Sequence, residues 1–283
     1  MDKPLVLELA ATGEPQRYQI RTTTAVQVAQ MQFANELLYL VDYTVLHQNE
    51  QGYVVQLEVL NAMQKATDLF SRVTADLNQA SRKLVLQTDA HGQLLHVENQ
   101  AEIRRAWEAV HPGLQAKYRA DATVKPYLEA FEAQLAVRGS MEDNLRDKGV
   151  CGALLLGIYG RKYQETPLLT KRQIKGFFHE LDLPLQLATT ATRDPAPAPP
   201  TVLLHTTGQV NNACFAEADF RRLMRSIVDD YTFPVALQLE YTAQHALAAT
   251  TGRLLRSQQL LAAEVPGIYR NTVTHEVFSQ PAA

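Results

Sequence analysis

Residues 235–247 read Val-Ala-Leu-Gln-Leu-Glu-Tyr-Thr-Ala-Gln-His-Ala-Leu, and their apolar side chains fall on every second position. The apolar positions are Val235, Leu237, Leu239, Tyr241, Ala243 and Leu247. Successive side chains of a β-strand point to opposite faces of the sheet. A period of two over this length therefore predicts a long strand with one buried and one wet face.

Two more strand-like runs follow this stretch and end near residue 278. The last turn, Val265-Pro266-Gly267-Ile268, matches a type II turn, because Pro fixes φ at its second position and Gly supplies a positive φ at its third. Strands joined directly by turns pair in alternating directions. The C-terminal part is therefore predicted to be an antiparallel meander whose apolar face must be covered.

Alternating and helical patterns divide the rest of the chain. Strands are expected at about 16–30, 37–45, 53–60, 84–88, 93–97, 184–192 and 202–210. Helices are expected at about 69–84, 99–114, 124–135, 170–181 and 214–230, and a buried connector or short core helix at 150–159. This order predicts an α+β fold, a long, curved antiparallel β-sheet with several helices packed on one face.

Three consecutive segments describe the expected organisation. They are an N-terminal sheet and helix half, 1–119, a helical connector, 120–183, and a C-terminal sheet half, 184–283, joined in one continuous globular unit. The proline-rich run 194–200 is read as a surface loop rather than a domain linker. The helix at 170–181 is predicted from a capping box, Thr170 with Gln173, before an apolar spacing near 3.6.

Composition and charge exclude several classes of protein. Hydrophobic residues make up 46% of the chain and the formal net charge is −3, so no overall positive field favours nucleic acid or an anionic membrane. No apolar stretch is long enough to span a membrane, and the N-terminus lacks the apolar region of a signal peptide. Two cysteines indicate no disulfide framework. We expect a cytoplasmic protein.

A mixed polar and apolar face of the meander is the candidate ligand site. If the last two turns are centred near Pro266-Gly267 and Thr251, His245 lies opposite Arg256 and Gln258 lies opposite His275. An Arg fork and Tyr walls on an apolar face are typical of a site for an anionic or amphipathic ligand. The alternative is a solvated sheet end. The predicted site residues are Tyr241, His245, Arg256, Gln258, Tyr269 and His275.

Catalytic and metal signals are weak. His205, His245 and His275 lack the close spacing of a zinc site, so no metal and no cofactor is expected. The chain has no nucleophile elbow, phosphate-binding loop or zinc-protease motif. Cys151 lies in an apolar run, whereas Cys214 near a helix start is the more reactive candidate. The basic residues Arg161, Lys162, Lys171, Arg172 and Lys175 indicate a solvated face.

The leading functional hypothesis is a non-catalytic binding or assembly protein that takes an apolar or amphipathic ligand or a protein partner. One alternative is a hydrolase or transferase that uses His245, His275 and Arg256. Another is a structural subunit of a multi-protein complex, held through its sheet edges. Neither a nucleic-acid partner nor a membrane span is expected, and the sequence does not define the oligomeric state.

Overall fold

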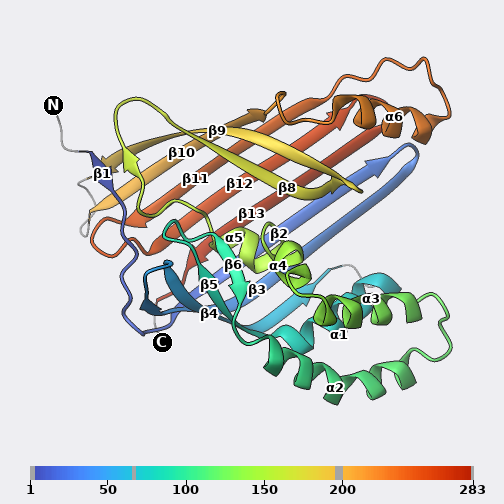
Figure 1. The fold of residues 1–283 in the computed structure, drawn as a ribbon, viewed down its shortest axis with the longest axis horizontal. Helices are drawn as coiled ribbons and strands as arrows, with labels where there is room; N and C mark the ends of the chain where they lie inside the picture. The colour runs from blue at the N-terminus through green and yellow to red at the C-terminus, as the bar shows by residue number, and fades with distance from the viewer. Residues whose placement is uncertain (1–3, 66–67, 195–199, 282–283) are drawn as a thin grey trace. The chain divides into compact units, whose positions relative to one another are not determined.

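The computed structural model describes residues 4–65, 68–194 and 200–281. Its main feature is an open sheet of eleven strands in the order β6-β5-β4-β3-β2-β13-β12-β11-β10-β9-β8, which confirms the α+β fold with a long antiparallel sheet (Figure 1). The middle five of the seven proline-rich residues, 195–199, lie outside the described residues.

The strands range from two residues to eighteen. The strands are β1 (Leu5–Val6), β2 (Gln16–Val28), β3 (Met31–Gln48), β4 (Tyr53–Gln64), β5 (Lys83–Thr88), β6 (Leu94–Val97), β7 (Lys162–Tyr163), β8 (Leu168–Phe178), β9 (Leu181–Asp194), β10 (Thr201–Val210), β11 (Gln238–Ala248), β12 (Leu254–Val265) and β13 (Tyr269–Ser279). β1 and β7 form a separate antiparallel pair.

The helices lie in three parts of the chain. They are α1 (Leu69–Leu77), which is followed by a short 3-10 turn, α2 (Gln100–Lys117), α3 (Lys125–Ala136), α4 (Ser140–Leu145), α5 (Gly149–Leu154) and α6 (Glu217–Val228). Among the described residues, none of these helices combines the length and the apolar character that crossing a membrane requires.

Two compact units interleave along the chain. The first contains Met1–Leu9, Arg21–Glu36 and Tyr159–Phe278, and the second contains the remaining residues. The three consecutive segments expected from the sequence do not follow this division, and their joining in one continuous globular unit stays a prediction.

The predicted helix at 170–181 is wrong, because these residues form β8, a turn and the start of β9. Phe178 and Leu181, which a helix would place on one face, are instead opposite partners across this hairpin. Gly176 has φ +58 in an irregular part of β8, and Asp182 accepts hydrogen bonds from its N–H and from Gln173. The spacing near 3.6 therefore arises from a hairpin that brings the apolar residues of two strands together.

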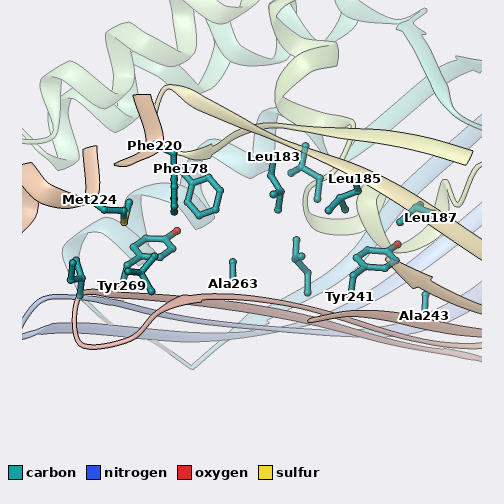
Figure 2. Close-up of a cluster of buried hydrophobic side chains, with 14 residues drawn as sticks. Phe178, Leu183, Leu185, Leu187, Phe220, Met224, Tyr241, Ala243, Ala263 and Tyr269 are labelled. Carbon is teal, nitrogen blue, oxygen red and sulfur yellow. The ribbon is translucent and has the colours of Figure 1, made fainter. Parts of the chain in front are cut away.

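The apolar core of the first unit lies between two layers of that unit. Figure 2 shows Phe178, Leu183 and Leu185 of the β8–β9 pair facing Tyr241 and Tyr269 of the meander. Phe220 and Met224 of α6 complete this cluster at one end. Burying such side chains contributes roughly 1.5–3 kcal/mol each to folding. The meander face predicted to be buried is therefore covered by the neighbouring strands as well as by a helix.

The second unit has its own core, in which α2 and α3 pack around Trp107. The indole ring stacks on His111 at 4.6 Å between ring centroids and contacts Phe131 at 4.9 Å. Glu142 of α4 accepts a hydrogen bond of 2.9 Å from the backbone N–H of Val97, in the edge strand β6. A carboxylate that accepts a hydrogen bond from an edge strand occupies a backbone N–H group with which another strand could otherwise pair.

Candidate functional site

The register of the meander separates the six predicted residues onto two faces. Leu247 lies opposite Leu254, as predicted, but His245 lies opposite Ser257 rather than Arg256. His275 lies opposite Gln259 rather than Gln258. The prediction that all six residues share one face is therefore wrong for Arg256 and Gln258, which lie on the outer face. Tyr241, His245, Tyr269 and His275 share the inner, core-facing side.

Two local features cause this change of face. Between the pairs Leu247–Leu254 and Ala246–Arg256, β12 contains one extra residue, Leu255, so it has a β-bulge. The last hairpin has a three-residue loop, since Val265 pairs with Tyr269. The predicted turn is present: the Ile268 N–H donates to the Val265 carbonyl at 3.0 Å, and Gly267 has φ +81. Each feature shifts the pairing by one residue, and a shift of one residue reverses the face of a side chain.

The inner face contains a belt of buried hydrogen-bonding side chains, which we call the inner belt: Thr22, His245, Ser257, Gln259 and His275. His245 Nδ1 lies 2.9 Å from Ser257 Oγ, and Gln259 Nε2 donates to the same oxygen at 3.3 Å. His275 Nδ1 lies 2.9 Å from Thr22 Oγ1. Buried polar groups that are paired in this way avoid the cost of lost hydration.

Burial keeps both imidazoles of the inner belt neutral at pH 7. It lowers the pKa of His245 to about 4 and that of His275 to about 4, and the positive charge of Arg172 lowers both pKa values further. Arg172 itself, in β8, donates from Nη1 to the Tyr241 hydroxyl at 3.1 Å. His245 and His275 are therefore neutral polar groups of the core, each hydrogen-bonded through Nδ1.

The two imidazoles are not arranged as an acid–base pair. His245 and His275 are two strands apart and two residues out of step, so their Cα atoms are about 12 Å apart by strand spacing. The Nδ1 of each ring is taken by a different hydroxyl, Ser257 Oγ for His245 and Thr22 Oγ1 for His275, so the two rings are not hydrogen-bonded to each other through these atoms. Tyr269 belongs to the apolar cluster, with its ring 5.5 Å from that of Phe178.

The outer face presents two adjacent rows of side chains across the same strands. In the first row, each residue directly opposes the next, and it contains Thr190, His205, Gln244, Gln258 and Glu276. The second row lies two residues along each strand and contains Thr192, Leu203, Ala246, Arg256 and Phe278. The first row is made of hydrogen-bonding groups, and the second is largely apolar with a single charge.

A hollow of about 470 Å³ lies over these two rows, and we call it the outer hollow. Its outward-facing lining residues are Thr190, Thr192, Leu203, His205, Gln244, Ala246, Arg256 and Gln258, and two residues whose side chains are buried on the inner face, Leu204 and His245, also border it. Ala246 has the smallest side chain of the second row and lies between Leu203 and Arg256. A short side chain between two long ones leaves a depression on a sheet surface.

The charge of the outer hollow is one-sided. Arg256 is the one permanently charged side chain of its lining, which contains no Asp or Glu. The Arg256 guanidinium lies 5.3 Å from the centroid of the Phe278 ring, at cation–π distance. Glu276, at the end of the first row, is outside the lining and lies 3.7 Å from Arg21. The hollow therefore has a single permanent positive charge, that of Arg256, on a chain of net charge −3.

Three of the predicted residues border the outer hollow: Arg256 and Gln258, which the sequence analysis placed on the wrong face, and His245, whose side chain is on the inner face. His205 was considered only as a metal ligand, and Leu203 and Gln244 were missed. The described residues contain no group of three or more His, Cys, Asp or Glu side chains able to hold a metal ion. The missing signal was the pairing of β9, β10 and β11, which no single strand pattern contains.

No protein-family model and no curated protein matches this chain.

Proposed function

We propose that this chain is a non-catalytic binding protein of the cytoplasm that holds an amphipathic ligand in the outer hollow. The observation that carries this proposal is the pairing of a polar row with a largely apolar row under one depression. Ligand pockets combine an apolar surface with a few polar groups that orient the ligand. The two rows supply both kinds of contact side by side.

The hydrolase or transferase alternative has less support. It needs His245, His275 and Arg256 to act on one substrate, but the two histidines belong to the inner belt and Arg256 lies on the outer face. A general acid or base must come within hydrogen-bond reach of the reacting group, directly or through one water. A sheet that separates the charged side chain from both imidazoles does not meet this requirement.

The test is a titration of the isotopically labelled protein with octanol, an uncharged amphiphile, followed by amide chemical shifts. We expect saturable shifts confined to β9–β12 around Ala246. Ala246→Phe fills the hollow, and we expect it to weaken octanol binding by at least about tenfold, which corresponds to about 1.4 kcal/mol. Phe is well tolerated in strands, so the variant should fold.

Ala262→Phe is the matched control. Ala262, on β12, is half-buried like Ala246 of β11. It faces outward opposite Glu240 and does not line the hollow. This variant should bind octanol as the wild type does. If octanol causes no saturable shifts, or if both phenylalanine variants weaken binding equally, the outer hollow is not the ligand site.

A further inference from the structure

The geometry points to an anionic amphiphile as the ligand of the outer hollow, with its carboxylate on Arg256 and its hydrocarbon chain over Ala246 toward Leu203. This inference rests on the proposed function and specifies the chemical class and the orientation of the ligand. Three observations carry it: the position of Arg256, the apolar path beside it and the donors of the neighbouring row.

Arg256 is placed to receive a carboxylate. Among the described residues no acidic side chain forms an ion pair with it, and its guanidinium lies over the Phe278 ring rather than beside an acid. An aromatic ring under a guanidinium restrains its plane and leaves its N–H edge available. That edge matches a carboxylate in two parallel hydrogen bonds.

An apolar path begins next to this charge. Ala246 lies directly opposite Arg256 on β11, and Leu203 lies directly opposite Ala246 on β10. Leu203 is 42% exposed, although it is a large apolar residue in the middle of a sheet face. Two strand spacings cover about 10 Å from Arg256 to Leu203. A short hydrocarbon chain lying across the strands would cover both apolar residues.

The neighbouring row adds uncharged hydrogen-bond donors. Gln258 follows Arg256 by two residues on β12, and Gln244 lies directly opposite Gln258. Their side-chain amides can donate to the outer oxygen of a carboxylate that Arg256 holds. Glu276 lies beyond Gln258 and is held toward Arg21, so the anion is expected on the Arg256 side of the row.

The test compares octanoate, octanol and octylamine, which share a chain and differ in headgroup charge. We expect octanoate to bind the wild type about tenfold more tightly than octanol, because hydrogen bonds to a charged group are stronger than those to a neutral one. Octylamine should bind more weakly than octanol. Arg256→Gln should weaken octanoate binding about tenfold and leave octanol binding within about twofold, since only the charged contact is lost.

Two variants control for charge and shape. Arg270→Gln removes one positive charge from an exposed position of β13 outside the hollow and should change neither affinity. Arg256→Lys keeps the charge but loses the two-pronged geometry, and it should restore octanoate binding only in part. The amide shifts of each variant report that the sheet is intact.

The outcomes separate this inference from the proposed function. If octanol binds in the hollow but octanoate binds no better, or if Arg256→Gln weakens both equally, the anionic class is overturned and the binding role stands. Tighter binding of octylamine than of octanoate also overturns it. Should neither octanol nor octanoate bind, both proposals fail. Inorganic phosphate binding at Arg256 without octanoate binding would identify a small anion and overturn the amphiphile.

Discussion

Ser257 lies directly opposite His245 across the β11–β12 ladder, and its hydroxyl oxygen is 2.9 Å from the imidazole Nδ1. Ser257 is 0% exposed, so its hydroxyl group is out of contact with solvent. Gln259, two residues along the same strand, donates to the same oxygen. This pair fixes His245 in the inner belt while its strand neighbours Gln244 and Ala246 face the outer hollow.

Ser257→Ala is expected to destabilise the fold by roughly 1–3 kcal/mol, because it leaves the buried Nδ1 of His245 and the amide of Gln259 without this partner. Chemical denaturation at pH 7 measures the effect. Thr207→Ala changes an exposed hydroxyl residue of β10 and should cost less than about 0.5 kcal/mol. Equal losses in the two variants would mean that the Ser257 hydroxyl contributes nothing specific.

Stability should fall as the pH is lowered from about 6.5 to about 4. Burial lowers the folded-state pKa of His245 and His275 to about 4, below the value of about 6.5 for an unfolded chain. The unfolded chain therefore takes up more protons in this window, and the free energy of unfolding decreases as protons are added. The contribution is fully present above pH 6.5 and amounts to about 3 kcal/mol per histidine.

The imidazole proton resonances of His245 and His275 in the native protein test this expectation directly, and their titration midpoints should lie below pH 5. Denaturation of a His245→Gln, His275→Gln double variant should show a shallower pH dependence than the wild type between pH 6.5 and 4. Titration midpoints near pH 6.5 for His245 and His275 in the native state would contradict the argument that burial lowers their pKa values.

Gly252→Ala should be far more damaging than Gly267→Ala. Both glycines have positive φ, at +64 and +81, and both lie in turns of the meander. A Cβ at Gly252 would overlap the carbonyl oxygen of Glu8, whereas one at Gly267 meets nothing within 4 Å. We expect a loss of about 1–2 kcal/mol at Gly267, from backbone strain alone. Thermal denaturation should show a clearly larger loss at Gly252, and equal losses would exclude the contact with Glu8.

The two cysteines should differ in reactivity toward a thiol reagent. Cys214 is exposed, whereas Cys151 is buried and burial raises its pKa to about 12. The native protein should therefore release one equivalent of product quickly, and the second only after unfolding. Cys214→Ser should abolish the fast phase. A fast phase that persists in this variant would show that Cys151 is accessible.

Most strands were predictable because their pattern is local. The alternation around Tyr241 requires only that one face be buried, and the structure buries Tyr241, Ala243, His245 and Leu247. The hairpin at β8–β9 was not predictable by the same means. Its apolar residues happen to repeat with a helical spacing, because Phe178 and Leu181 approach each other across a turn. The hydrophobic pattern of one short stretch of sequence cannot distinguish a helix from such a hairpin.

The long alternating strands, the turn at Pro266-Gly267 and the α+β class could be predicted from the amino-acid sequence, since each follows from the preferences of neighbouring residues. Which side chains share a face depends on how the strands pair in the folded protein. One extra residue at Leu255 and one in the last loop moved Arg256 and Gln258 to the outer face. Register depends on pairing between strands, and a one-residue bulge reverses a face while leaving the hydrophobic pattern of each strand almost unchanged.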